Sequence, residues 1–267
     1  MKPGLRLCDA WRLLLHPMPA MTETWIFPDW PAPPSVHAAT TTRDGPGMSM
    51  SPYERFNLGL RCGDVAEAVT ANRSALQQVL ALPSAPRWLH QVHGSDVAEL
   101  GPLPTLNEPR ADAAVSHIQA TVLSILTADC LPVLFCAEDG SEIAAAHAGW
   151  RGLAGGVLEA TVIQLATAPA RLMAWLGPCI GAASYEVGAE VRASFVDHHP
   201  DAASCFVATR SGHWLCDLAG LARQRLASAG VTRVYGGGFD TLTDSRFYSY
   251  RRDGSASGRF ASLIWLT

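Results

Sequence analysis

Three short segments of the chain carry side chains that bind metal ions or act as nucleophiles, and each adjoins a predicted turn. They contain His93, Cys130 and His147. Imidazole nitrogens and thiolate sulfur are common zinc ligands, and three protein ligands leave a fourth tetrahedral position for water or substrate. The residues therefore predict a catalytic zinc site. Their spacing is too long to be diagnostic, so a buried cysteine with two hydrogen-bonding histidines is the structural alternative.

Arg151 follows His147 closely and stands between Gly149 and Gly152. At a turn from a strand to a helix, backbone N–H groups and a guanidinium group can bind the same anion. We therefore expect Arg151 to bind phosphate or an anionic transition state. A second glycine-containing turn, 177–181, has the same potential, although such turns also occur for purely steric reasons.

The hydrophobic pattern predicts the elements that position these residues. Apolar runs and turn signals predict more strands than helices, and many strands are continuously apolar, which is typical of a sheet covered on both faces. We expect one α/β domain with mixed β-sheets flanked by helices. The predicted strands are 36–42, 87–92, 113–117, 121–126, 132–136, 143–147, 172–176, 231–235 and 262–266, and the predicted helices are 65–82, 153–166, 189–197 and 217–229.

The composition excludes several classes of protein. Lys2 is the only lysine, so Schiff-base enzymes and lysine-containing P-loops are excluded. The formal charge of -4 gives no basic surplus for binding nucleic acid. The longest apolar stretch, 120–136, contains Asp129, so we expect no membrane span. Seven scattered cysteines without a CxxC pair favour a reducing compartment, and we predict a cytoplasmic protein.

The first 20 residues differ from the rest. Arg12, His16 and Pro17 interrupt their apolar run, so no signal-like core forms. We interpret 1–20 as a disordered or misannotated extension, with a weak targeting peptide as the alternative, and 21–267 as a single catalytic domain.

Several longer strings in the chain closely resemble the YfiH/LACC1 family, also called DUF152 or the polyphenol oxidase (laccase-domain) family. The resemblance implies an α/β fold with mixed sheets related to a toxin deamidase domain, and zinc ligands at His93, Cys130 and His147. It also implies purine nucleoside phosphorylase activity on adenosine, inosine, guanosine and methylthioadenosine, with adenosine deaminase activity. The strings are HQVHGSDV, TADCLPVLF, AHAGWRGLAGGV, GPCIGAASYEVG, and FYSYRRDG followed by SGRFASLIWL.

The implied chemistry assigns further roles and reveals one departure. Arg151, with Arg43 as a second residue, is expected to bind phosphate because the arginine fork engages two oxygens at once. Asp129, beside Cys130, is either an acid–base group or a structural hydrogen-bonding acid. Relatives commonly have a cysteine where this chain has Asp240 or Thr241, so a role of that cysteine does not transfer.

Three other functions remain open. One is a copper-dependent polyphenol oxidase, although the chain has no HxH strings for a trinuclear copper cluster. Another is a hydrolase of a small molecule or peptidoglycan precursor, with Cys130 as nucleophile and His147 as base. The third is a regulatory binding module with a structural metal, which the open fourth ligand position disfavours.

The remaining conspicuous residues have structural interpretations. Arg251, Arg252 and Asp253 are interpreted as either substrate contacts or a turn with a solvated charge pair. Tyr248 and Tyr250 alternate along a predicted strand and should share one packed face. We expect buried core positions for Trp150, Trp175, Trp265, Cys62, Cys136, Cys179, Cys205 and Cys216.

Overall fold

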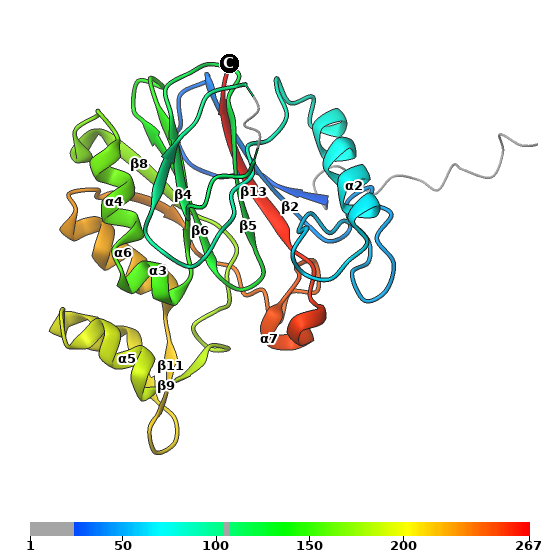
Figure 1. Cartoon of the computed structure of the whole chain (residues 1–267). Helices are drawn as coiled ribbons and strands as arrows, with labels where there is room; N and C mark the ends of the chain where they lie inside the picture. The colour runs from blue at the N-terminus through cyan, green and yellow to red at the C-terminus, as the bar shows by residue number, and fades with distance from the viewer. Residues whose placement is uncertain (1–23, 104–106) are drawn as a thin grey trace, which may run out of the picture.

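The computed structural model describes residues 24–103 and 107–267, so the predicted extension 1–20 lies outside the described residues. Two larger sheets are packed face to face, and helices cover their outer faces (Figure 1). The prediction of one α/β domain with mixed sheets flanked by helices is confirmed. Among the described residues, no helix has the length and apolar character needed to cross a membrane.

The larger sheet has six strands in the order β12-β8-β6-β7-β4-β3. Two of its neighbouring pairs, β12/β8 and β3/β4, are parallel and the others are antiparallel, so the sheet is mixed. Every residue of β6 and β7 is buried, as expected for strands covered on both faces. The strands are β3 (Val97–Glu99), β4 (Ala113–Ser116), β6 (Leu131–Ala137), β7 (Ile143–Ala148), β8 (Leu172–Leu176) and β12 (Arg233–Gly236).

The second sheet is antiparallel and has the order β1-β2-β13-β5. Its strands are β1 (Trp25–Ile26), β2 (Val36–Thr41), β5 (Val122–Thr127) and β13 (Phe260–Leu266). A smaller antiparallel sheet, with the order β10-β11-β9, lies with α5 at one end of the molecule (Figure 1). Its strands are β9 (Glu186–Gly188), β10 (Phe206–Ala208) and β11 (His213–Cys216).

The alternation of side chains along β6 explains the layers. Val133 and Phe135 belong to the apolar cluster beneath the helices, whereas Leu134 and Cys136 belong to the cluster between the two larger sheets. A third cluster packs α2 on the outer face of the four-stranded sheet. The helices are α2 (Ala66–Val79), α3 (Trp150–Ala154), α4 (Val157–Gln164), α5 (Ala189–Val196), α6 (Leu218–Ser228) and α7 (Tyr250–Asp253), with 3-10 turns at Pro169–Arg171, Pro200–Cys205 and Gly254–Ala256.

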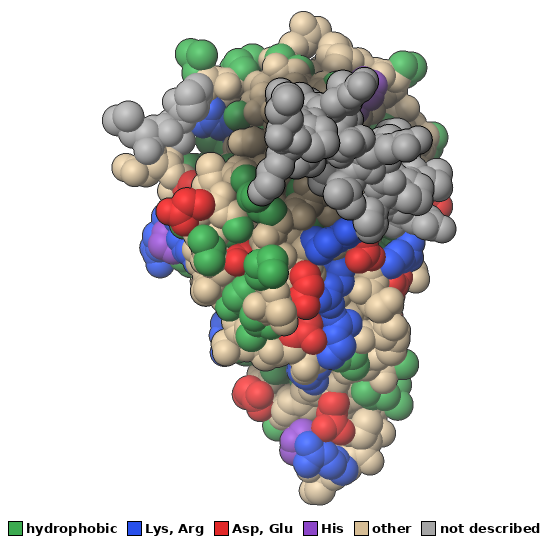
Figure 2. Space-filling model, turned by 90° about the vertical axis from the view of Figure 1, so that its right-hand side faces the viewer, with side chains coloured by type: hydrophobic (Ala, Val, Ile, Leu, Met, Phe, Trp, Pro, Cys, Tyr) green, Lys and Arg blue, Asp and Glu red, His purple; other side chains and the backbone are tan. Residues whose placement is uncertain are grey.

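The side of the molecule that carries α2 has mixed charge. Acidic and basic side chains lie next to one another on this side (Figure 2). Glu108 pairs there with two arginines, and its Oε1 lies 3.0 Å from Arg73 Nη1 while its Oε2 contacts Arg61. The basic groups on this side are therefore partly neutralised by neighbouring acids.

Two predicted elements are wrong in a way that affects the functional site. The predicted helix 153–166 is two helices, because Gly156 adopts a left-handed φ of 89° that ends α3 and starts α4 in a new direction. The predicted strand 87–92 does not form, and only isolated bridges occur at Arg87 and His90. Instead, the Gln91 side chain donates to Leu126 O and accepts from Leu126 N, both at 2.8 Å.

The predicted strand through Tyr248 and Tyr250 is also wrong. Tyr248 is fully buried, but Tyr250 is 53% exposed and begins α7. Ser249 between them accepts a hydrogen bond from Arg252 N and caps this helix. The two tyrosines therefore do not share a packed face.

Candidate metal centre and active site

The structure brings together the three residues that the sequence predicts as metal ligands. His93 follows the irregular segment held by Gln91, Cys130 lies in the turn between β5 and β6, and His147 lies near the end of β7. Their possible ligand atoms all lie within 4.8 Å of one another. Cys130 Sγ is 3.8 Å from His93 Nε2, and the two imidazole centroids are 4.7 Å apart.

Asp112 anchors both histidines, and the sequence analysis did not identify it. Its fully buried carboxylate accepts hydrogen bonds from the backbone N–H groups of Val92, His93 and Gly94, at distances from 2.7 to 3.2 Å. Asp112 Oδ1 also lies 2.8 Å from His147 Nδ1. This bond directs His147 Nε2 towards Cys130. The separate hydrogen bond from His93 N holds His93, whose backbone φ is 61°, in its left-handed conformation.

The charges of this cluster depend on one another. Burial by itself would raise the pKa of the Cys130 thiol, but the charge of His147 and hydrogen bonds from His147 and His93 outweigh it and lower the pKa to about 6. Burial also opposes protonation of His147, yet Cys130 and Asp112 together raise its pKa to about 9. In the metal-free protein, these opposite shifts favour a thiolate at Cys130 beside an imidazolium group at His147.

The donor set fits a divalent metal such as zinc. Two imidazole nitrogens and a thiolate are suitable ligands, and the hydrogen bond from Asp112 is the outer-sphere support that metal-binding histidines usually have. Among the described residues, no fourth His, Cys, Asp or Glu joins the group. The arrangement therefore matches an open catalytic site better than a closed structural one.

The three residues line a cavity of about 590 Å³. This volume is in the range of small-molecule sites. Apolar and aromatic surfaces make up much of its wall, and Trp150, which the sequence predicts as core, is only partly buried and lines the cavity. The aromatic and basic residues of the lining are Trp150, Tyr185, Tyr250, Arg61, Arg151, Arg251 and Arg259.

Arg151 lies at the start of α3, on the same cavity wall as the ligands. Its guanidinium carbon lies 4.3 Å from the centre of the Trp150 ring, and no hydrogen bond or ion pair joins it to another described residue. Gly149 lets the backbone at the start of α3 pack closely against the ligand side chains. A Cβ at this position would lie 2.9 Å from Cys130 Sγ and 3.0 Å from His93 Cδ2. The predicted strand-to-helix turn thus presents an exposed cation beside the metal ligands.

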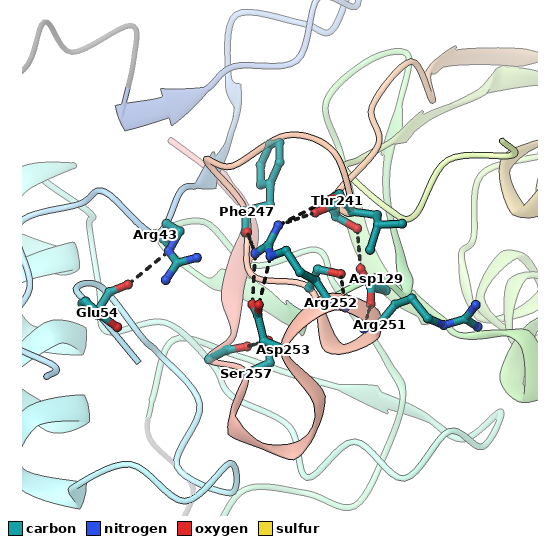
Figure 3. A network of polar contacts seen from close by, with 12 residues as sticks. Arg43, Glu54, Asp129, Thr241, Phe247, Arg251, Arg252, Asp253 and Ser257 are labelled. Carbon is teal, nitrogen blue, oxygen red and sulfur yellow. Dashed lines mark hydrogen bonds and ion pairs between the residues drawn. The ribbon is translucent and has the colours of Figure 1, made fainter. Parts of the chain in front are cut away.

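The structure does not bring Arg43 to this cavity. Arg43 Nε donates to Glu54 O at 3.2 Å, and its guanidinium carbon lies 5.0 Å from the centre of the Tyr248 ring. Figure 3 places Arg43 apart from Asp129 and Arg251, both of which line the cavity. A contact between Arg43 and phosphate stays a prediction from the sequence.

Asp129 connects three segments around the cavity (Figure 3). Its carboxylate accepts from Thr241 Oγ1 at 2.6 Å and from Arg251 N at 2.6 Å, so both oxygens are engaged. Asp129 itself has a φ of 85°, and its carbonyl accepts from Ile180 N. This geometry favours the structural role that the sequence analysis allowed for Asp129.

Asp240 is one of the two residues, with Thr241, at which the family resemblance leads us to expect a cysteine. Its carboxylate accepts from Gly181 N, Leu242 N and the Ser184 hydroxyl, at 3.0, 3.0 and 2.5 Å. The second glycine-containing turn is therefore fastened to the loop that precedes α7.

Besides Cys130, the described chain has five cysteines, all predicted to be core residues, and all five are buried and form no disulfide.

The comparisons with known proteins agree on one family. A family model described as "Multi-copper polyphenol oxidoreductase laccase" matches residues 37–267. A Xylella fastidiosa protein named purine nucleoside phosphorylase is 53% identical, over 91% of this chain and 97% of its own length. The Escherichia coli protein named purine nucleoside phosphorylase YfiH is 49% identical, over 90% and 98%. The chain belongs to the YfiH family.

Solved structures of YfiH-family proteins have the same fold. A Neisseria meningitidis protein described as DUF152 is 46% identical and superposes with a TM-score of 0.86, covering 91% of this chain and 99% of that one. YlmD from Geobacillus stearothermophilus is 29% identical, with a TM-score of 0.80 over 87% and 92%. The layered sheets described above are thus the YfiH fold.

Proposed function

We propose that this YfiH-family protein is a zinc-dependent purine nucleoside phosphorylase that accepts adenosine, inosine, guanosine and methylthioadenosine and also deaminates adenosine. One observation carries the proposal: His93, Cys130 and His147 meet on the wall of a cavity that also holds the unpaired cation of Arg151. Two relatives that this chain matches over most of its length bear the name purine nucleoside phosphorylase.

In phosphorolysis, a phosphate oxygen forms a bond to C1′ of the ribose while the bond from C1′ to the purine nitrogen breaks. The products are ribose 1-phosphate and the free base, which takes up a proton. Arg151 would bind the phosphate and orient it, since its guanidinium is exposed and its face is already covered by Trp150. Tyr185 and Tyr250 also line the cavity, and aromatic rings of this kind can pack against a purine.

The metal ion would be held by His93, Cys130 and His147. When bound, zinc would supply Lewis-acid chemistry towards a substrate or a water molecule. Asp112 holds the two histidines in place through its hydrogen bonds, so the ligands need little rearrangement on binding. In deamination, water replaces the 6-amino group of adenosine and ammonia leaves.

Product analysis of adenosine incubated with the purified, zinc-loaded protein tests the proposal. Adenine that forms only when phosphate is present would support phosphorolysis, and inosine would support deamination. Both products should disappear in His93→Ala and Cys130→Ala. Unchanged adenosine under both conditions would overturn the purine proposal.

A second candidate function has one specific observation in its favour. Without metal, Cys130, His147 and Asp112 have the order of a nucleophile, a base and an orienting acid, and the pKa of Cys130 is low. This fits a cysteine-nucleophile hydrolase acting on a small molecule or peptidoglycan precursor. Metal content distinguishes the two, because a thiolate bound to zinc is a poor nucleophile. Stoichiometric metal in the active protein would exclude the hydrolase.

The copper-dependent polyphenol oxidase remains a third candidate because of the description of the family model. Within the described residues, His93, Cys130 and His147 are the single group of metal-binding side chains found, so a multi-copper cluster has no counterpart there. Phenol oxidation by the copper-loaded protein at a rate above that of adenosine turnover would favour this candidate. Cytoplasmic location and the lack of nucleic-acid or membrane partners stay predictions.

A further inference from the structure

Four arginines line the cavity, and they differ in what their guanidinium groups already bind. Arg61 Nη1 is paired with Glu108. Arg259 Nη1 donates to the carbonyl oxygens of Ser257 and Gly258, at 2.6 and 2.8 Å. The Arg251 guanidinium makes one hydrogen bond, to Glu186 O, and the Arg151 guanidinium makes no hydrogen bond or ion pair among the described residues. A phosphate ion would meet the least competition at these two.

We infer that Arg251 is the second arginine of the phosphate-binding site and acts together with Arg151. This inference rests on the proposed phosphorylase function and names the residues that would bind its anionic substrate. From the sequence alone, Arg251 is either a substrate contact or part of a turn with a solvated charge pair, and Arg43 is the expected second phosphate-binding arginine.

Three contacts, with Asp129, Glu186 and Tyr185, hold Arg251 in place. Its backbone N–H donates to Asp129 Oδ2 at 2.6 Å, which ties it to the residue beside Cys130. Its Nη1 donates to Glu186 O at 3.1 Å, and its guanidinium carbon lies 5.2 Å from the centre of the Tyr185 ring. A side chain fixed in this way loses little conformational entropy when it binds an anion.

The supports leave most of the guanidinium free. The backbone carbonyl uses one of the five N–H donors, and the tyrosine covers a face of the group rather than its edge. The remaining donors along the edge can engage two phosphate oxygens at once. Arg151 has the same character, because Trp150 covers its face and its donors are unused among the described residues.

The guanidinium of the adjacent Arg252, unlike that of Arg251, is already engaged in hydrogen bonds, so of these two arginines only Arg251 is free to bind phosphate. Its guanidinium donates to the carbonyl oxygens of Thr241, Leu242 and Phe247 and to the Asp253 carboxylate. Figure 3 shows the Arg251 and Arg252 side chains pointing away from each other. Arg252 therefore fastens α7 to the preceding loop, and Arg251 extends from α7 into the cavity lining.

Arg251 also lies close to the metal ligands through the chain itself. Asp129 accepts a hydrogen bond from Arg251 N and directly precedes Cys130. Arg151 is the second residue of α3, and Gly149, which precedes that helix, packs against Cys130 and His93. Arg151 thus follows the ligand His147 in the chain, and Arg251 is hydrogen-bonded to the segment that carries Cys130. An anion bound by both arginines would lie in the cavity that the metal ligands also line.

The test is the variant Arg251→Gln, with Arg192→Gln as the matched control. Arg192 is also stacked on an aromatic ring, with its guanidinium carbon 5.3 Å from the Trp214 ring centre, but it lies on α5 outside the cavity. We expect Arg251→Gln to raise KM for phosphate about tenfold or more, because charged hydrogen bonds are lost, and to change KM for adenosine less than about threefold. Arg192→Gln should change neither value.

Titration calorimetry with inorganic phosphate and no nucleoside separates this inference from the proposed function. Phosphate binding that is lost in Arg251→Gln supports the inference even if the wild-type protein does not turn over adenosine. Equal phosphate affinity in both proteins, or no binding by the wild type, overturns it even if phosphorolysis is observed. If Arg251→Gln does not fold, Arg251→Lys keeps the charge but not the fork, and the same rise in KM for phosphate is expected.

Discussion

Asp112 Oδ1 lies 2.8 Å from His147 Nδ1, and the same carboxylate holds the backbone of the segment that carries His93. One buried acid thus positions two of the three predicted metal ligands. Because the ligands come from separate parts of the chain, the site depends on such a shared anchor. The contribution of Asp112 to zinc affinity and to stability can be measured without following catalysis.

Replacing Asp112 by asparagine should weaken zinc binding about 10- to 100-fold, as is typical when the outer-sphere partner of a ligating histidine is lost. The amide also places an NH2 group against backbone N–H donors, so we expect a loss of about 1–3 kcal/mol in the free energy of unfolding. Chelator competition and denaturant titration measure the two effects.

The control for this experiment is Asp217→Asn. Asp217 also accepts a backbone hydrogen bond, from Gly220 N at 2.8 Å, but it caps α6, and asparagine caps helices well. Zinc affinity should remain unchanged in this variant. Equal zinc affinity in Asp112→Asn and the wild type would show that the anchor is dispensable.

The low pKa of Cys130 predicts the pH dependence of its reactivity in the metal-free protein. Alkylation by iodoacetamide proceeds through the thiolate, so its rate should reach half its maximum near pH 6 instead of near the usual value of about 8.5. Zinc should block the reaction. Cys130→Ala serves as the control, since the five other cysteines of the described chain are buried. A midpoint above pH 8 would contradict the proposed thiolate–imidazolium pair.

The packing at Gly149 predicts a purely steric effect on the site. Its φ of -63° suits any residue, so Gly149→Ala tests only the space for a Cβ, which would lie 2.9 Å from Cys130 Sγ. We expect zinc affinity to fall about tenfold or more, as the ligands are displaced. Gly238→Ala is the matched control, because no atom lies within 4 Å of a Cβ at that position. Chelator competition on both variants would show whether the ligands tolerate this displacement.

The strongly apolar parts of the fold were predictable from the sequence. The strand 172–176 matches β8 at both ends, and the strand 143–147 differs from β7 by one residue, because continuous apolar runs between turns have few alternatives in a covered sheet. The short strands β9, β10 and β11 were missed. They have three or four residues each and are formed by pairing across the chain rather than by a local pattern.

The site was predictable only in part. The resemblance indicated His93, Cys130 and His147, and the structure places them together, but the spacing alone could not have chosen them. Asp112 gave no local signal, because its partners lie about 20 residues before it and 35 residues after it. The segment 87–92 has the composition of a strand, and a side-chain amide, that of Gln91, replaces the expected pairing.

Asp240, which holds the 181–184 turn, gives a further prediction. Partial burial opposes its ionisation, but hydrogen bonds from Ser184, Gly181 and Leu242 outweigh this and lower its pKa. Asp240→Ala leaves these donors without their acceptor, so we expect a loss of about 1–3 kcal/mol in the free energy of unfolding near pH 7.

The pH dependence of this loss has a defined sign. A carboxylate whose pKa is lower in the folded state stabilises the protein above its unfolded pKa of about 3.9, and this contribution is lost as the pH falls through the folded value. The difference in stability between wild type and Asp240→Ala should therefore be constant from pH 7 to about pH 5 and shrink below pH 4. Denaturant titrations across this range measure it. A difference that grows on acidification would show that the Asp240 carboxylate is not held in its ionised form by the 181–184 turn.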